Sequence, residues 1–402
     1  AVPVFAGNEK AYLNECIDTT FVSSVGKFVD RFEEDMAKYT GAKRAVVCVS
    51  GTNALHMSLL LAGVKKDDEV LTQALTFIAT CNALSYIGAH PVFLDVDKST
   101  MGLSPDAMKE WLQANAEIRK NTRIAELPES QDFAFREDEL ACYNKHTGCR
   151  IKACVPMHTF GHAVRIEEIV ALCKEWHIEL VEDAAESIGS TYKGQHTGTF
   201  GRIGAISFNG NKMITTSGGG ALLCHTEEEA RRVKFYATQA REPFPWYQHE
   251  QIGYNYRLSN VSAGIGRGQM RVVDNHIARR RSIHRLYTEL LAGLPGITVV
   301  EPKKSTMFLP NYWLTTIKVD SNETGFSALQ LMQHLAKADI ETRPLWKPLH
   351  LQPVFSSSPS YVNGISEALF NCGLCLPSGP MVTDGDVMRV ADAIRSMIES
   401  IK

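Results

Sequence analysis

Short apolar runs alternate with amphipathic segments along most of this chain. Apolar residues at helical spacing (Phe28, Phe32, Met36 and Tyr39) predict a helix with a buried face near the start. Strands are then predicted at residues 45–49, 69–71, 91–96, 152–158, 178–183 and 204–208, with helices at 54–61, from 77 to about 87 and at 166–176. Strand and helix alternate in units of about 30 residues, which predicts an α/β fold with a mainly parallel sheet covered on both faces.

The pattern changes in two places. Residues 116–150 are polar and rich in acidic side chains, which predicts a surface insertion. After about residue 245 an aromatic and polar loop at 253–258 precedes a long helix, whose Arg- and His-rich stretch 271–285 is expected to form a solvated or interface face. Strands at 296–300 and 313–319 and helices at 329–337 and 384–398 follow. We therefore expect a large domain over residues 1–245 and a smaller C-terminal α/β domain over 246–402.

Composition narrows the classes of partner. The chain has 402 residues, of which 44% are hydrophobic and 22% charged, and a formal net charge of -3. These values are typical of a globular protein and give no reason to expect a nucleic-acid or membrane-surface partner. No apolar run approaches the roughly 18 residues that span a bilayer, and the first residues do not resemble a signal peptide. A cytoplasmic location is expected.

The ten cysteines are scattered. Cys372 and Cys375 form a single CxxC pair, and Cys142, His146 and Cys149 lie in a looser group with Cys154. Metal or redox use is one interpretation of these groups. Reduced thiols in a cytoplasmic protein are the other, and we expect no metal site.

The stretch 204–220 contains the main candidate for chemistry. A short apolar strand enters a polar turn that ends at Lys212, and glycines 218–220 follow. A lysine held at the end of a strand can act as a nucleophilic amine when burial or neighbouring charge lowers its pKa. The alternative is a solvated surface lysine in a flexible loop.

Other polar residues follow predicted strands and are expected at the same edge of the sheet, where open α/β sheets bind ligands. The backbone N–H groups of the turn Ser50-Gly51-Thr52-Asn53 lie at a predicted helix start and could form an anion site. The alternative is an ordinary Ser/Thr N-cap. Asp183 and His158 end two later strands, and Phe77 enters a helix, where it stacks on a planar ring or packs in the core.

Together these groups indicate a cofactor. A lysine amine forms an imine, a carboxylate keeps a pyridine nitrogen protonated, a Gly/Ser/Thr turn holds a phosphate, and an aromatic residue fixes a ring plane. Pyridoxal 5'-phosphate (PLP) requires this set of groups.

The sequence also resembles a known family over nearly its whole length. The motifs, in chain order, are Gly51-Thr52 with Ala54-Leu55, Thr76-Phe77, Glu182-Asp183-Ala184-Ala185, Ser207-Phe208 before Lys212, the glycines after it, and Gly253-Tyr254-Asn255-Tyr256-Arg257. They look like those of the DegT/DnrJ/EryC1/StrS family of PLP-dependent nucleotide-sugar aminotransferases. The resemblance implies PLP fold type I, similar to aspartate aminotransferase, with a mostly parallel seven-stranded sheet in the large domain.

Residues 207–212 and 155–162, preceded by the longer insertion, look most like the LegC branch of that family. This implies transfer of the amino group of L-glutamate to C4 of a UDP-linked 4-keto-6-deoxy-N-acetylhexosamine, for legionaminic acid or bacillosamine-type sugars of surface glycans. Pyridoxamine phosphate would be the intermediate form of the cofactor.

The resemblance also implies roles for individual residues. Lys212 would be the Schiff-base lysine and proton shuttle, and Asp183 would pair with the pyridinium nitrogen. Phe77 would stack on the ring, while Gly51, Thr52 and Ser207 would bind the phosphate. Asn255 would reach the phosphate from a neighbouring subunit, so the active unit should be a homodimer. Glu186 stands where many relatives have Gln or His near the ring hydroxyl; it is either protonated or has a different role.

Six residues are nominated for the sugar site. Ser24 and His158 are chosen by loop position and resemblance, and Arg257, Arg343, Trp346 and His350 as polar or aromatic residues on small-domain loops. For each of them an ordinary structural role, such as a turn or a solvated loop residue, is the alternative.

Other functions remain as alternatives. One is a PLP enzyme with another reaction or another nucleotide-linked keto sugar, such as a decarboxylase, a carbon–carbon lyase or a dehydratase. Dehydratase relatives have His in place of the lysine, so Lys212 argues against that reaction. A non-catalytic binding protein with the PLP fold is a second alternative. A nicotinamide-dependent sugar enzyme is a third, but its GxGxxG turn is missing here.

Overall fold

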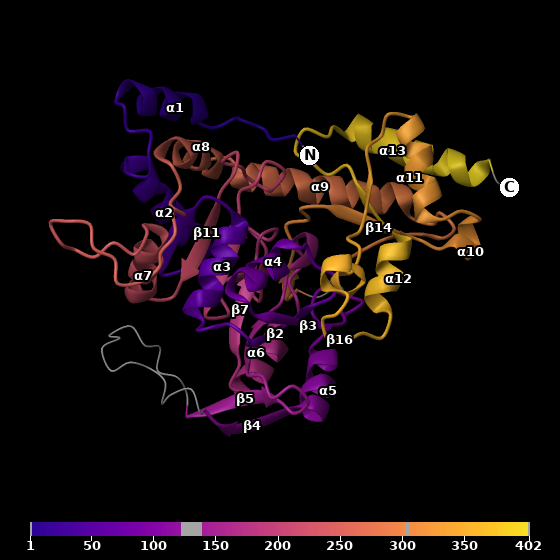
Figure 1. Cartoon of the computed structure of the whole chain (residues 1–402). Coiled ribbons are helices and arrows are strands. Elements are labelled where there is room, and N and C mark those ends of the chain that lie inside the picture. Colours follow the sequence, from indigo (N-terminus) through magenta and orange to yellow (C-terminus); the bar gives the residue numbers. More distant parts are fainter. Residues whose placement is uncertain (1, 122–138, 302–305, 401–402) are drawn as a thin grey trace.

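The computed structural model describes residues 2–121, 139–301 and 306–400. It confirms the predicted α/β fold with a large, mostly parallel sheet (Figure 1). Seven strands of five residues are joined at one edge by a two-residue eighth strand. The order across the sheet is β1 (Arg44–Cys48), β11 (Gly220–Cys224), β10 (Ile203–Ser207), β7 (Glu179–Asp183), β6 (Ile151–Val155), β2 (Glu69–Gln73), β3 (His90–Leu94) and β16 (Ser360–Tyr361).

The direction of the strands decides where the polar residues at their carboxyl ends lie. β11 is antiparallel to both β1 and β10, whereas the pairs from β10 across to β16 are parallel. β1, β10, β7, β6, β2 and β3 therefore run in the same direction. Their carboxyl ends share one edge of the sheet, and the turns that follow them lie along that edge.

Helices cover both faces of this sheet because its strands are apolar on both sides. In β1, Val46 and Cys48 belong to one buried cluster, and Ala45 and Val47 belong to another on the opposite face. The first face is covered by α3 (Gly51–Leu61), α4 (Ala79–Ile87) and α7 (Glu227–Ala237). The second is covered by α2 (Lys27–Thr40), α5 (Pro105–Asn115), α6 (Ile166–Glu175) and α8 (Asn260–Met270).

The C-terminal part has its own antiparallel sheet and its own core. The strand order is β12 (Ile297–Val299), β14 (Thr315–Val319), β17 (Gly373–Leu376) and β15 (Arg343–Pro344). Helices α9 (Val273–Leu291), α11 (Ala328–Lys337) and α13 (Asp384–Glu399) contribute the apolar side chains that pack with it. The smaller elements are α10 (Ser321–Thr324), α12 (Ile365–Cys372) and the 3-10 helices η3 (Leu349–Leu351) and η4 (Pro353–Phe355).

The long helix expected through residues 271–285 is two helices, because the chain breaks at Arg271 and Val272 between α8 and α9. Helix α8 packs against α1 (Glu9–Asp18) and α2, whereas α9 packs against α13, β12 and β14. The expectation of a solvated or interface face is also wrong in part. Arg280 is fully buried and donates from Nη1 to the carbonyl oxygens of Trp313 and, at 3.1 Å, Ser378. The domain boundary near residue 245 stays a prediction.

A short segment joins the C-terminal part to the large sheet. Strand β16 pairs with β3 through Ser360 and Tyr361. Next to it, the carboxylate of Asp95 accepts hydrogen bonds from the backbone N–H groups of Asn363, Ile365 and Ser366, at 2.8, 3.0 and 2.9 Å, and from the Ser366 hydroxyl. Burial opposes ionisation of Asp95, but these hydrogen bonds outweigh it and lower its pKa.

Two smaller sheets complete the architecture. β8 (Thr191–Tyr192) lies between β9 (Gln195–His196) and β13 (Phe308–Leu309). The described ends of the predicted insertion form an antiparallel pair, β4 (Ala116–Lys120) with β5 (Leu140–Asn144), at the bottom of Figure 1. Residues 122–138 of the predicted insertion lie outside the described part of the chain.

Candidate active site

Lys212 is held inside the molecule. The chain leaves β10 at Ser207 and turns, and the Lys212 N–H donates to the Asn209 carbonyl at 3.0 Å. Lys212 Nζ lies 2.9 Å from Glu186 Oε1 and 4.4 Å from the centre of the Trp313 ring. Its side chain is 12% exposed. A solvated surface lysine does not fit these contacts, so the amine is placed for chemistry or for a buried ion pair.

Asp183 lies at the end of β7 and is buried. Thr80 Oγ1, from α4, donates to Oδ2 at 2.7 Å, and the Ala185 N–H donates to Oδ1 at 3.2 Å. Burial raises the pKa of Asp183 above its usual value, and the hydrogen bond from Thr80 opposes that shift. The carboxylate is therefore costly to keep ionised unless a cation approaches it.

Glu186 is also buried, three residues further along. Its Oε2 accepts the Phe160 N–H at 2.9 Å, and its backbone carbonyl accepts the Asn311 side-chain amide at 2.9 Å. Burial raises the pKa of Glu186 to about 7. Phe160 belongs to η2 (Thr159–Gly161) and has a φ of 54°, a conformation that non-glycine residues rarely adopt. The surroundings thus hold this carboxyl group in one place beside Lys212.

The turn after β1 caps helix α3 and also leaves N–H groups free to bind an anion. Ser50 is the N-cap of α3, since its Oγ accepts the Asn53 N–H at 3.1 Å. In the described part of the chain, the N–H groups of Gly51 and Thr52 have no protein acceptor. A Cβ added at Gly51 would lie 2.8 Å from Ser207 Cβ, so only glycine lets the two turns approach this closely. Two free N–H donors and the Ser207 hydroxyl thus lie together at a helix N-terminus.

Aromatic rings from four segments form a row of contacts that starts at Trp313, beside Lys212. Phe77, after β2, is 49% exposed, so it is not a core residue. Its ring centre is 6.1 Å from that of Trp346, and Trp346 lies 4.7 Å from Phe160. Phe160 stacks on Trp313 at 6.3 Å. Trp346 was predicted for this region, whereas Phe160 and Trp313 were not.

These residues fit PLP. The amine, the buried carboxylate, the pair of free N–H groups and the exposed aromatic ring come from four turns at one edge of the sheet. Lys212 can bond to an aldehyde, Asp183 can pair with a protonated ring nitrogen, and Gly51, Thr52 and Ser207 can bind a phosphate.

Two of the nominated sugar residues already contact a buried carboxylate. The ring of His158 is fully buried: Nε2 donates to Glu182 Oε2 at 2.9 Å and Nδ1 accepts the Val164 N–H at 3.2 Å. His158 therefore has no free polar atom for a sugar. Arg257 is not on a small-domain loop, because it borders β1 and its Nη1 lies 2.6 Å from Glu33 Oε1.

Glu182 is a buried carboxylate to which the sequence analysis gave no role. Besides His158, it accepts the N–H groups of Gly198, Phe200 and Gly201 at 2.7, 2.6 and 2.7 Å. Burial opposes ionisation, but these hydrogen bonds lower the pKa of Glu182. Glu182 and His158 thus brace the loop after β9.

The remaining nominees lie at the surface or in the C-terminal part. Ser24 and Asn255 line one cavity of about 420 Å³ together with Arg257, Val49 and Gly218. Arg343 is exposed and pairs with Glu341 at 2.6 Å. His350, in η3, contacts Glu367 through Nε2 at 3.1 Å.

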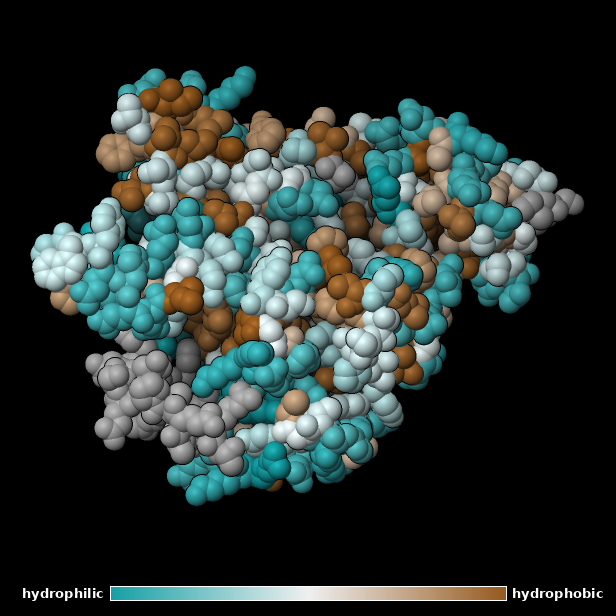
Figure 2. All heavy atoms as spheres, in the orientation of Figure 1, coloured by the Kyte–Doolittle hydropathy of each residue, from teal (hydrophilic) through white to brown (hydrophobic). Residues whose placement is uncertain are grey.

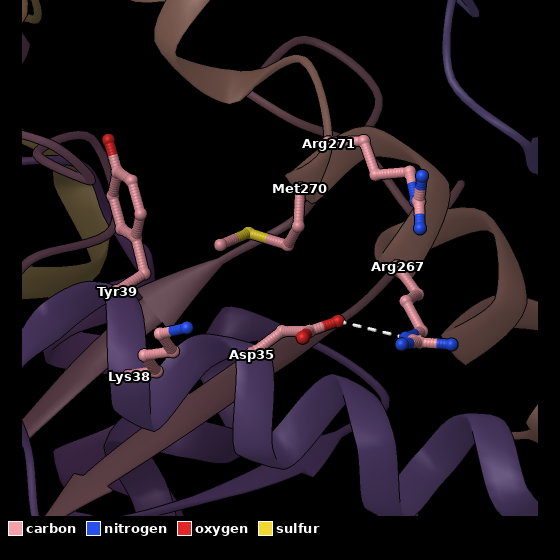
Figure 3. A pocket seen from close by; sticks show the side chains of 6 residues that line it. All are labelled: Asp35, Lys38, Tyr39, Arg267, Met270 and Arg271. Atoms are coloured by element: carbon pink, nitrogen blue, oxygen red, sulfur yellow. Dashed lines mark hydrogen bonds and ion pairs between the residues drawn. The ribbon is translucent and has the colours of Figure 1, made fainter.

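Two further cavities have different characters. One of about 570 Å³ lies beside Asn211 and Trp313 and extends over β15 and α13 of the C-terminal part. Another, of about 430 Å³, lies between α2 and α8 (Figure 3). There Arg267 Nε bonds Asp35 at 3.0 Å, and Lys38 and Arg271 extend into the opening. This second cavity contains none of the residues proposed for chemistry.

All ten cysteines are free thiols. Across the described ranges, no cluster of His, Cys, Asp and Glu is arranged to hold a metal ion. In the same part of the chain, every helix is too short or too polar to cross a membrane.

Comparisons of sequence and of structure with known proteins both lead to aminotransferases. The sequence model of the DegT/DnrJ/EryC1/StrS aminotransferase family matches residues 4–395. EpsN of Bacillus subtilis (strain 168), provisionally named a pyridoxal phosphate-dependent aminotransferase, is 38% identical over 404 residues, covering 100% of this chain and 95% of EpsN. GDP-perosamine synthase of Escherichia coli O157:H7 is 33% identical over 98% of this chain and 96% of its own. The crystal structure of the aminotransferase TlmJ from Streptoalloteichus hindustanus superimposes with a TM-score of 0.84 at 25% identity, covering 100% of this chain and 98% of TlmJ.

Proposed function

The chain belongs to the DegT/DnrJ/EryC1/StrS aminotransferase family and is a PLP-dependent sugar aminotransferase, and from this premise we propose its donor, its acceptor and its site residues. The donor is L-glutamate, and the acceptor is the C4 ketone of a 4-keto-6-deoxy sugar linked to a nucleoside diphosphate. One observation carries the proposal: the Lys212 amine, the Asp183 carboxylate and the Gly51-Thr52 turn lie along one edge of the sheet.

Each residue has a definite task in this reaction. PLP, when bound, supplies an electron sink for the carbon that carries the transferred nitrogen. Asp183 holds the ring nitrogen and keeps it protonated, while Gly51, Thr52 and Ser207 bind the phosphate. Lys212 takes the α-proton of the donor and later delivers a proton to C4 of the sugar. Phe77 holds the ring plane, and its exposed face leaves room for that contact.

The nucleotide has two candidates. The sequence resemblance favours a UDP-linked 4-keto-6-deoxy-N-acetylhexosamine and the LegC branch. The second candidate is a GDP-linked sugar, because the similar proteins from Escherichia coli O157:H7 and Caulobacter vibrioides are named GDP-perosamine synthase. Arg343, Trp346 and Ser24 are our candidates for contacts to the acceptor, since each reaches the surface or a cavity.

We also propose that the active unit is a homodimer in which Asn255 binds the phosphate in the partner's site. Asn255 is exposed on a loop whose neighbours Tyr254 and Tyr256 stack on each other and pack against His56 of α3. Beside its cavity, exposed apolar side chains gather over α1 and the segment after it, at the upper left of Figure 2: Ile17, Phe21, Val22 and Val25. Burying this surface against a second copy would be favourable.

The test uses absorbance of the purified enzyme. Adding L-glutamate should replace the visible absorbance of lysine-bound cofactor by that of the pyridoxamine form, with one 2-oxoglutarate per site. Separate additions of UDP- and GDP-linked 4-keto-6-deoxy sugars should then restore the first spectrum with only one nucleotide series, and mass spectrometry should detect the amino sugar. A cofactor spectrum that responds to neither glutamate nor any keto sugar would contradict the proposal.

A further inference from the structure

The contacts of the Lys212 amine raise a chemical problem. A lysine bonds to an aldehyde only as the uncharged amine. Here the ring face of Trp313, 4.4 Å away, and the carboxylate of Glu186, 2.9 Å away, are both placed to attract a positive charge on the amine. The lysine side chain is 12% exposed and that of Glu186 is 1% exposed, so bulk water has little access to take the proton. A proton acceptor is needed within the site.

Glu186 is the group placed to be that acceptor. Its Oε1 faces Lys212 Nζ, while Oε2 is held by the Phe160 N–H at 2.9 Å. The Asn311 side-chain amide donates to the Glu186 carbonyl at 2.9 Å, and its Oδ1 accepts the Trp313 backbone N–H at 2.8 Å. The carboxylate, the amine and the tryptophan ring are thus positioned as one unit.

We propose that Glu186 takes the ammonium proton of Lys212, so that the amine is uncharged when it bonds to the cofactor aldehyde. This inference rests on the proposed role of Lys212. One N–H bond of the ammonium group breaks and an O–H bond forms at Glu186 Oε1. The freed lone pair bonds to the aldehyde carbon, and the two remaining hydrogens leave with the aldehyde oxygen as water. The same exchange readies Lys212 to act as a base whenever the amine is released during turnover.

The surroundings allow this exchange near neutral pH. The titratable groups that act on Glu186 are Lys212 and Asp183 at the end of β7, and Glu186 acts in turn on the Cys375 thiol of β17. Burial and the negative charge of Asp183 favour the protonated carboxyl, and Lys212 favours the carboxylate. Burial raises the pKa of Glu186 to about 7, which brings the two forms close in energy near pH 7. Because the two groups share a proton, they titrate as a pair.

The experiment measures how fast PLP bonds covalently to the full-length apoenzyme. Stopped-flow absorbance gives the rate, and borohydride reduction with mass spectrometry identifies the modified lysine. In the wild type the rate should change by less than about threefold between pH 7 and pH 9, because the proton stays within the pair. In Glu186→Gln the amine must lose its proton to water, so the rate should fall about 100-fold from pH 9 to pH 7.

Two further measurements make the outcome decisive. Glu227→Gln is the matched control, because Glu227 lies on α7 and pairs with Arg44 at the surface. It should keep the wild-type profile. If Glu186→Gln does not fold, infrared spectra of the wild type with ¹³C-labelled glutamate carboxyls should show a protonated glutamic acid band as PLP bonds. A flat profile in Glu186→Gln, or no such band, would overturn the inference. If no bond forms at Lys212 in the wild type, the proposed function fails instead.

Discussion

The hydrogen bond from Thr80 to Asp183 allows a quantitative test of the site's electrostatics. Thr80 Oγ1 lies 2.7 Å from Asp183 Oδ2, and both residues are buried. Valine has nearly the shape of threonine, so Thr80→Val removes the donor without leaving a cavity. A hydrogen bond to a charged group contributes about 1.5–3 kcal/mol, and one between neutral groups about 0.5–1.5 kcal/mol. We expect Thr80→Val to lower the free energy of unfolding of the apoenzyme by about 1.5–3 kcal/mol where Asp183 is ionised.

The loss should depend on pH in a known direction. Burial raises the pKa of Asp183, so folding favours its protonated form, and ionisation destabilises the folded state as pH rises. The Thr80 hydroxyl reduces that cost only while the carboxylate is charged. The destabilisation by Thr80→Val should therefore be largest at pH 8 and shrink as the pH is lowered. Urea unfolding of the apoenzyme at a series of pH values measures this directly.

Thr76→Val is the matched control. Thr76 is buried next to Thr80, and among the described residues its hydroxyl bonds to the Thr80 hydroxyl at 3.0 Å and Met157 Sδ at 3.0 Å. Thr76→Val should lower the free energy of unfolding by about 0.5–1.5 kcal/mol at every pH, since no charged group is involved. Equal, pH-independent losses for Thr76→Val and Thr80→Val would refute the reasoning.

Four other predictions follow from the site and the core. Lys212→Ala should keep PLP bound without the lysine-linked absorbance and lose turnover; residual activity within tenfold of wild type would contradict its role. Mixed dimers of Lys212→Ala and Asn255→Ala subunits should regain activity that neither variant has alone, whereas no recovery would place Asn255 in its own subunit's site. Burial lowers the pKa of His162 to about 3, so the folded state excludes a proton that the unfolded chain takes up below about pH 6.5. The stability measured by urea unfolding should thus fall from pH 7 to pH 5, less steeply in His162→Gln. Gly161 has a φ of +92°, and in Gly161→Ala the new Cβ would lie 1.8 Å from Asn311 Oδ1. The free energy of unfolding in urea should fall by about 1–3 kcal/mol. Gly148→Ala is the control, because Gly148 has a φ of +72° but lies in open space, and its loss should be much smaller.

The sequence predicted the parts of the site that follow strand ends. Lys212, Asp183 and Gly51 come together because parallel strands bring their carboxyl ends to one edge, whatever the details of packing. The same rule placed His158 at that edge, which is where its backbone lies. A strand-end rule does not give the direction of a side chain, and the ring of His158 points into the core toward Glu182.

Residues that reach the site from distant segments could not be predicted in this way. Thr80 reaches Asp183 from a helix, and Trp313 reaches Lys212 from the C-terminal part. Neither has a local pattern that differs from core packing, because the contact depends on how whole elements are arranged. Arg257 gives another example: its place in a loop suggested a ligand contact, and the structure adds an ion pair with Glu33 of α2 that no local pattern indicated.

The segment joining β3 to the C-terminal part limits how the enzyme can move. A hinge rotation that opened or closed the two parts would pull β16 from β3 and strip Asp95 of the donors at Asn363, Ile365 and Ser366. Such a rotation would leave a buried, ionised carboxylate that keeps the Val96 N–H but loses these donors, which is unfavourable. A hinge at this segment is therefore disfavoured, and temperature factors or exchange rates should be low across residues 360–366 in every catalytic state.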